Sequence, residues 1–227
     1  MSQNKPVAVV VGAGPGLGAA CARRFSAAGM TAVLVSRNVE RLEELTSSIE
    51  GAIPFPCDAS KEEAVNKLFD EVERDHGPVE VCVYNPGGGF QRVHVAEQTA
   101  ARFRTVWEST AFGGFLTGRA AARKMLTRGR GSILYTGATA SLRGGQGFSA
   151  LASGKFALRA VAQSMARELG AEGIHVAHIN IDGAIGKSQD GSKLDPDDIA
   201  ETYYGLYKQT RTNWTQELDI RPWTEKW

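Results

Sequence analysis

Short apolar runs alternate along the whole chain with segments of helical periodicity. The apolar runs predict buried strands at residues 7–12, 31–36, 52–58, 79–85, 131–137, 174–181 and 217–221. Apolar positions recurring every three or four residues predict helices at residues 17–28, 39–49, 61–77, 99–126, 149–172 and 195–209. Continuous apolar strands are typical of a parallel sheet that helices cover. The order therefore predicts an α/β fold: a single Rossmann-like, doubly wound parallel sheet with helices on both faces.

The alternation continues without a linker or an internal repeat, so we expect residues 1–227 to form one domain. Residues 183–198 interrupt it with a run rich in Gly, Ser and Asp, which predicts a flexible loop beside a substrate site. The C-terminal tail carries Trp214, Trp223 and Trp227. Because exposed tryptophans are unfavourable, we expect them to pack on the domain or on a neighbouring subunit.

The overall charge is nearly balanced, at +1. This balance argues against a nucleic-acid or acidic-membrane partner. The N-terminus lacks the apolar core of a signal peptide, and no apolar run approaches ~18 residues, which disfavours secretion and membrane spanning. Three scattered cysteines without CxxC spacing predict reduced thiols in a cytoplasmic protein, and four histidines without ligand spacing predict no metal site.

A glycine-rich segment, VGAGPGLGAA (residues 11–20), joins the first predicted strand to the first predicted helix. Its glycines allow a tight turn, a close backbone approach to a pyrophosphate, and close packing of the helix on the strand. The amides at the helix start then face the phosphates. The segment therefore predicts dinucleotide binding at Gly12, Gly16, Leu17 and Gly18.

The GxxxGxG spacing resembles that of the short-chain dehydrogenase/reductase superfamily, and other segments agree with it in order. CDAS (57–60) resembles the family's adenine-contacting Asp segment, YNPGG (84–88) its NNAG segment, and NIDGAI (180–185) its PG loop with Asp182 in place of the proline. GSILYTG (131–137) and the helix with Lys155 match the fifth strand and the catalytic helix. The resemblance implies cofactor contacts from Asp58, Asn85, Gly87, Lys155, Gly183 and Ile185.

The second predicted strand ends in VSRN (residues 35–38). NAD-preferring members of the superfamily usually carry an acidic residue here, whereas this chain has Ser36 followed by Arg37. A carboxylate repels a 2′-phosphate, and a guanidinium binds it with two hydrogen bonds. We therefore predict that the cofactor is NADP(H) rather than NAD(H), held in part by Ser36 and Arg37.

The catalytic positions depart from the family pattern. Enzymes of the superfamily use Asn, Ser, Tyr and Lys, and only Lys155 is retained here. The other three positions fall at Thr110, Ala138 and Leu151, and no tyrosine lies between residues 136 and 202. Thr139, next to the missing serine, either binds a substrate carbonyl oxygen or caps the backbone of its own turn.

Two functions are therefore compatible with the sequence. The first is an NADP(H)-dependent, carbonyl-type reductase that takes its proton from water or from the substrate. The second is a catalytically silent NADP(H)-binding protein that acts as a sensor or a regulatory partner. Phe90, Phe148 and the loop 183–198 suggest a partly apolar pocket for a small molecule that the sequence does not identify. The resemblance also implies a homodimer or homotetramer paired through helices 99–126 and 149–172.

Overall fold

The computed structural model describes residues 5–87 and 91–225. In these residues, seven parallel strands form one sheet in the order β3-β2-β1-β4-β5-β6-β7. The strands are β1 Val7–Val11, β2 Thr31–Ser36, β3 Ile53–Pro56, β4 Val79–Tyr84, β5 Gly131–Thr136, β6 Ile174–Ile181 and β7 Glu217–Ile220. The predicted parallel α/β sheet is confirmed.

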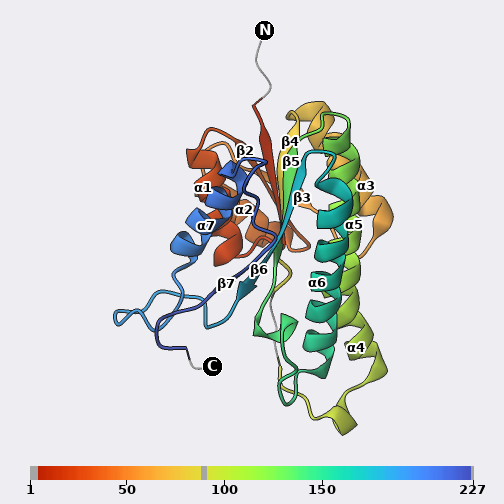
Figure 1. The fold of residues 1–227 in the computed structure, drawn as a ribbon, viewed down its shortest axis with the longest axis vertical. Helices are drawn as coiled ribbons and strands as arrows, with labels where there is room; N and C mark the ends of the chain where they lie inside the picture. Colours follow the sequence, from red (N-terminus) through yellow and green to blue (C-terminus); the bar gives the residue numbers. More distant parts are fainter. Residues whose placement is uncertain (1–4, 88–90, 226–227) are drawn as a thin grey trace.

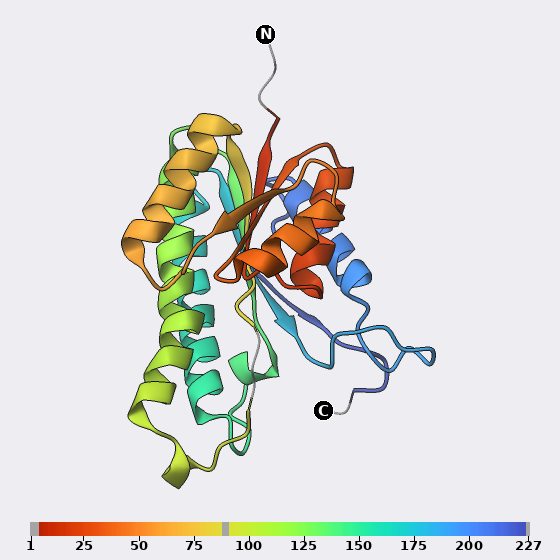
Figure 2. The same cartoon turned by 180° about the vertical axis from the view of Figure 1, so that it is seen from behind.

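Helices cover both faces of the sheet (Figures 1 and 2). One face carries α1 Leu17–Ala27, α2 Val39–Ser47 and α7 Pro196–Lys208. The other carries α3 Glu62–Asp75, α4 Ala100–Trp107, α5 Gly113–Leu126 and α6 Ser149–Leu169. Each face of the sheet carries its own hydrophobic core. Side chains alternate along a strand, so Val9 packs in one core and Val10 in the other. This alternation explains why the strands are apolar throughout, and it confirms the doubly wound architecture.

The single long helix expected at residues 99–126 is interrupted by a π-helical segment, η2 Glu108–Phe112. The amide of Gly113 donates to the carbonyl of Glu108, one residue further back than in an α-helix. The carbonyl of Ser109 instead accepts a hydrogen bond of 2.6 Å from the hydroxyl of Tyr84. The prediction of a regular helix was therefore wrong at this point, since a side chain from β4 takes a carbonyl that the helix would use.

The loop after β6 folds back on itself. A bridge pairs Ile185 with Leu194, and the amide of Gly186 donates to the carbonyl of Leu194 at 2.8 Å. Helix α7 then begins at Pro196, capped by the carboxylate of Asp195. The loop therefore ends at Asp195, three residues before the predicted end at residue 198. Its flexibility stays a prediction.

The tryptophans of the tail differ in their environment. Trp214 stacks on the ring of His175, with ring centroids 5.1 Å apart, as expected for a packed tail. Trp223 is 82% exposed, so within this protomer the expectation of packing is wrong for it. Trp227 lies outside the described residues. Packing of Trp223 on a neighbouring subunit stays a prediction.

The thiols of Cys21, Cys57 and Cys82 are free and buried. Within residues 5–87 and 91–225, no group of acidic, histidine or cysteine side chains is arranged to hold a metal ion. No helix in the same residues is long and apolar enough to cross a membrane.

Candidate functional site

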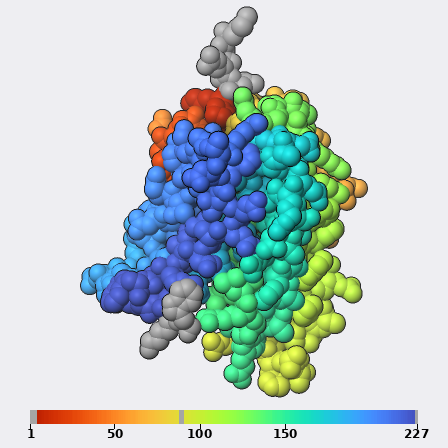
Figure 3. Space-filling view, viewed as in Figure 1, coloured from red at the N-terminus to blue at the C-terminus, as the bar shows by residue number. Residues whose placement is uncertain are grey.

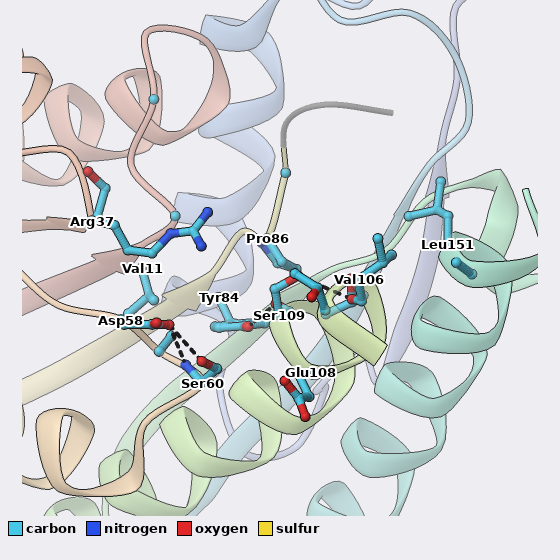
Figure 4. A pocket seen from close by; sticks show the side chains of 18 of the residues that line it. Val11, Arg37, Asp58, Ser60, Tyr84, Pro86, Val106, Glu108, Ser109 and Leu151 are labelled. Atoms are coloured by element: carbon cyan, nitrogen blue, oxygen red, sulfur yellow. Dashed lines mark hydrogen bonds between the residues drawn. The ribbon is translucent and has the colours of Figure 1, made fainter. Parts of the chain in front are cut away.

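A cavity of about 680 Å³ follows the carboxyl ends of the strands (Figure 4). Its walls include the residues that follow β1, β2, β3 and β4, and it extends to α4 and to the start of α6. The sheet order reverses between β1 and β4, because β2 and β3 lie on one side and the later strands on the other. Ligands of open α/β sheets bind at such a switch point. The fold therefore places the cavity where a dinucleotide is expected.

The glycine turn after β1 forms one wall, and two of its glycines are required by packing. Gly12 has a φ of +84°, and an added Cβ would lie 2.1 Å from the carbonyl oxygen of Asn85. The side chain of Asn85 in turn donates to the carbonyl of Gly12 at 3.2 Å. An added Cβ at Gly18 would lie 2.8 Å from the Cα of Ala13, within the strand–helix contact. Asn85 thus supports the turn and is not itself part of the cavity lining.

The start of α1 suits an anion. Gly16 precedes the helix without a side-chain cap, the first turn has no acidic residue, and an added Cβ at Gly16 would meet no described atom within 4 Å. Leu17 buries its side chain in the core, so only its backbone faces outward from the turn. Unpaired amides and the positive end of a helix together favour a phosphate group. These residues fit the pyrophosphate of a dinucleotide.

Arg37 lies at one end of the cavity, above Asp58 (Figure 4). Its guanidinium makes no ion pair with the described residues. Asp58 accepts hydrogen bonds from the amide and the hydroxyl of Ser60, at 3.0 and 2.8 Å. Burial opposes ionisation of this carboxyl, but the Ser60 bonds and the charge of Arg37 together lower its pKa. Ser36 also lines the cavity and donates to the carbonyl of Asn38 at 3.3 Å.

The opposite end of the cavity is formed by Leu151, on the first turn of α6 (Figure 4). Thr110 also lines the cavity, and it packs against α6 at Gly154, where an added Cβ would lie 2.9 Å from the Cβ of Thr110. Lys155 lies one turn beyond Leu151 and is only 2% exposed, behind the cavity wall. Its ammonium donates to the carbonyl of Thr136 at 2.7 Å. Burial lowers the pKa of Lys155 from 10.5 to about 7.

The turn after β5 is tied to the loop after β6. The hydroxyl of Thr139 donates to the carboxylate of Asp182, whose other oxygen lies 3.3 Å from the guanidinium of Arg221. Ser141, and not Thr139, caps the turn, because its hydroxyl accepts from the amide of Ala138 at 3.1 Å. The capping role considered for Thr139 was therefore wrong. Ala138 and Thr139 do not line the cavity.

Five other expected contact residues also lie outside the cavity lining: Gly16, Leu17 and Gly18 of the glycine turn, and Gly183 and Ile185 after β6. An added Cβ at Gly183, where φ is +151°, would lie 2.6 Å from Pro222. Ile185 is exposed at the start of the folded-back loop. Gly87 and Phe148 do line the cavity, whereas Phe90 and Gly88 lie outside the described residues. The cavity thus contains the residues predicted for the adenosine end, Ser36, Arg37 and Asp58, but not Lys155, Gly183 or Ile185, which were predicted for the nicotinamide end.

Several lining residues have no counterpart in the sequence prediction. They come from β4, from the segment between β4 and α4, from α4 and from η2: Tyr84, Gln91, Gln98, Arg102, Thr105, Glu108 and Ser109. The hydroxyl of Tyr84 is no substitute for the missing tyrosine, since it is bound to the carbonyl of Ser109 and burial raises its pKa. No sequence signal distinguishes these side chains, because polar residues on one face of a helix are typical of a solvent-exposed face.

Comparison with known proteins accounts for this arrangement. The model of the family described as short chain dehydrogenase matches residues 6–186. The chain belongs to this family. It is therefore an oxidoreductase of the short-chain type, with a site for NAD or NADP.

Several relatives support the assignment. A short-chain dehydrogenase from Rhodopseudomonas palustris is 43% identical, with a TM-score of 0.86 over 97% of this chain and 100% of the other. A metagenomic short-chain oxidoreductase solved with NADP is 28% identical, with a TM-score of 0.84 over 96% of this chain and 97% of the other. Carbonyl reductase family member 4 of Danio rerio is 30% identical over 75% of this chain and 72% of its own length.

Proposed function

We propose that this short-chain dehydrogenase is an NADP(H)-dependent reductase of carbonyl compounds whose proton does not come from a tyrosine at position 151. The observation that carries the proposal is the continuous cavity between Arg37 and Leu151. It joins a phosphate-binding turn and an unpaired guanidinium to the helix that bears Lys155. The relative solved with NADP and the carbonyl reductase relative support the same reading.

The residues of the adenosine end have distinct tasks in this proposal. The start of α1 binds the pyrophosphate, and Asp58 contacts the adenine. Arg37 binds the 2′-phosphate, because its guanidinium lines the cavity and makes no ion pair with a carboxylate of the described residues. A bound NADPH supplies the hydride. The protein's contribution is then to orient a carbonyl carbon beside the nicotinamide and to exclude water.

The proton requires a different source from the family's tyrosine. Leu151 holds no exchangeable proton, and the hydroxyl of Thr139 is bound to Asp182. Lys155 is a buried cation one helical turn away, and a pKa of about 7 lets its ammonium release a proton at neutral pH. We propose that Lys155 protonates the substrate oxygen, with water bridging the wall formed by Leu151. Water alone as the donor is the simpler variant of the same reaction.

A second candidate function is a catalytically silent NADP(H)-binding protein. The apolar side chains at Ala138 and Leu151 favour it, since they remove both the oxygen-binding hydroxyl and the acid. The double substitution Ala138→Ser with Leu151→Tyr separates the two candidates. We expect it to raise the reduction of simple ketones or aldehydes at least ~10-fold, a small part of what a positioned acid contributes.

The native substrate decides the interpretation of that variant. A reductase with its own proton source should lose its native reaction when Tyr fills the space of Leu151, while it gains the generic one. A silent protein should gain turnover from nothing. If the variant binds NADPH normally and reduces nothing, position 151 does not face the nicotinamide, and the assigned helix register is wrong. The screen pairs NADPH and NADH with aldehydes, ketones and imines.

A further inference from the structure

The Leu151 end of the cavity carries a second unpaired guanidinium, from Arg102 in the first turn of α4. Its Nη1 donates to the side-chain carbonyl of Gln91 at 3.1 Å, and its Nε is buried without a hydrogen-bond partner. Gln98 lines the same wall. Because the Nε is shielded from solvent, a ligand oxygen would reach this guanidinium through its terminal nitrogens.

The position of Arg102 within the cavity follows from its neighbours. Gln91 is adjacent in sequence to Arg92, whose guanidinium lies 5.3 Å from the ring centroid of Phe148. The carbonyl of Phe148 accepts from the amide of Ala152, next to Leu151 in the first turn of α6. Helix α4 also packs against α6. Arg102 therefore belongs to the substrate end, while Arg37 belongs to the cofactor end.

Most buried or half-buried arginines of this protein are neutralised. Arg128 pairs with Glu73 at 2.8 Å, Arg159 with Glu217 at 2.8 Å, and Arg221 with Asp182 at 3.3 Å. Within the described residues, Arg102 and Arg92 have no ion pair. Glu108 also lines the cavity (Figure 4), but it makes no ion pair with Arg102. Arg102 is thus not neutralised by an ion pair with any carboxylate of the described residues.

We propose that Arg102 is the specificity-determining residue of an anion subsite, and that the substrate is a carbonyl compound bearing a carboxylate or phosphate group. This inference rests on the proposed reductase function and names its substrate class. The guanidinium binds the anionic group through its terminal nitrogens, with the charge-assisted hydrogen bonds that make Arg–carboxylate and Arg–phosphate pairs strong. Gln91 and Gln98 supply amide donors beside it, and Arg92 adds a nearby positive charge.

Matched substrate pairs test this proposal. Acetoacetate is compared with methyl acetoacetate, and dihydroxyacetone phosphate with dihydroxyacetone, using NADPH and the wild-type protein, Arg102→Gln, and Arg104→Gln as a control. Arg104 is an exposed arginine on the same helix that does not line the cavity. We expect the wild type to prefer one anionic member at least 10-fold in kcat/KM. Arg102→Gln should remove that preference through KM, and Arg104→Gln should keep it.

A binding measurement covers the case of slow or absent turnover. Butyrate and methyl phosphate, which cannot be reduced, are titrated by ligand-observed NMR into the protein with and without NADP⁺. We expect one of them to bind, and Arg102→Gln to weaken it at least 5-fold while Arg104→Gln changes it less than 2-fold. Binding of butyrate would identify the anionic group of the substrate as a carboxylate, and binding of methyl phosphate would identify it as a phosphate.

Three results would overturn the inference: equal use of charged and neutral partners, an equal loss of both in Arg102→Gln, or no NMR-detected binding of either anion. Failure of the proposed function is distinct from these results. It would appear as absence of NADPH binding, or of any reduction, in the wild-type protein, while the NMR titrations still report on Arg102.

Discussion

At the scale of single residues, unpaired charge marks the ends of the cavity. Several arginines on the helices pair with carboxylates, as Arg23 does with Asp197 and Arg119 with Glu62. Arg37 has no such partner among the described residues and lines the cavity beside Asp58. Because exposed ion pairs contribute little to folding stability, Arg37 has more effect on ligand binding than on the stability of the fold. A 2′-phosphate is the group that distinguishes NADP(H) from NAD(H).

We expect NADPH to bind at least several-fold more tightly than NADH, and Arg37→Ala to remove most of this difference. The physical reason is the loss of a charge-assisted, two-bond contact with the phosphate. Isothermal titration calorimetry with both cofactors measures the effect, and Arg123→Ala, on the exposed side of α5, serves as the control. Equal wild-type affinities for the two cofactors would rule out the role assigned to Arg37.

Lys155 is the other residue whose environment makes a measurable difference. The unfolded chain keeps the ordinary pKa of about 10.5, while burial lowers the folded-state pKa to about 7. Between these two values the unfolded state binds more protons, so the free energy of unfolding rises with pH. His178, whose pKa burial lowers to about 4, finishes titrating below this range. The raised pKa values of the Cys21, Cys57 and Cys82 thiols lower the stability as the unfolded thiols ionise near pH 9, equally in the wild type and in a Lys155 variant.

The difference in stability between the wild type and Lys155→Met from pH 7 to 9 therefore isolates Lys155. We expect the wild type to gain about 2 kcal/mol of stability relative to Lys155→Met across this window. Urea unfolding at pH 7, 8 and 9, without cofactor, measures both proteins. Parallel pH dependences would show that the ammonium of Lys155 is not desolvated in the folded state, and would remove the physical basis for its role as a proton donor.

At the scale of elements, the turn between β1 and α1 separates structural from binding glycines. Gly12 adopts a left-handed conformation against the carbonyl of Asn85, whereas Gly16 has open space where its side chain would be. We expect Gly12→Ala to destabilise the fold by about 2 kcal/mol or more. Gly16→Ala should leave stability nearly unchanged and weaken NADPH binding at least 10-fold, because the methyl group occupies the approach of the pyrophosphate.

Chemical denaturation and calorimetry on the same two variants check this division. A Gly16→Ala variant that binds NADPH as the wild type does would mean that the pyrophosphate does not approach this face of the turn. A Gly12→Ala variant of unchanged stability would contradict the conformation of the turn itself.

The same elements show how far the sequence determines the structure. Strand β6 has the predicted bounds, because its apolar run is uninterrupted and both faces are buried. The π-helical segment could not be predicted, since it depends on the hydroxyl of Tyr84, a residue distant in sequence, reaching the carbonyl of Ser109. The contact between Thr139 and Asp182 has the same cause, because it joins loops that follow neighbouring strands. Local patterns predict elements, while side chains that cross between elements decide the details of the site.

The residues of the candidate site also differ in how far the sequence predicts them. The residues of the glycine turn, Arg37 and Asp58 follow strands directly, so their meeting at one sheet edge could be predicted from the strand order. Arg102 could not be assigned in this way. It enters the cavity only because α4 packs beside the start of α6, and an arginine in a first helical turn has no distinctive sequence signal.

At the scale of the whole molecule, α4, η2 and α5 expose aromatic side chains, and α6 exposes Phe156. The exposed aromatics of the first group are Phe103, Trp107, Phe112 and Phe115. Phe112 and Phe115 stack, with ring centroids 6.4 Å apart, so they form one apolar patch. Figure 3 shows that α6 forms part of the molecular surface beside the C-terminal segment. Exposed apolar patches of this kind are typical of interfaces between subunits.

We expect the protein to be a homodimer or homotetramer at micromolar concentration, and Phe115→Glu to shift it toward the monomer by placing a charge in the apolar patch. Val39→Glu, on α2 at the opposite face of the sheet, is the control, since Val39 is also exposed. Multi-angle light scattering measures both variants. A wild-type protein that is only monomeric would show that these aromatics, and Trp223, are exposed for another reason.

The most direct test of the proposed reductase uses NADPH carrying deuterium at C4 of the nicotinamide, with each face labelled in turn. The wild-type protein is incubated with acetoacetate, methyl acetoacetate and a set of simple aldehydes, and the products are examined by mass spectrometry. We predict deuterium on the former carbonyl carbon of at least one product, from one labelled face only. Tight binding of NADPH without deuterium in any product would contradict the reductase and favour the silent cofactor-binding protein.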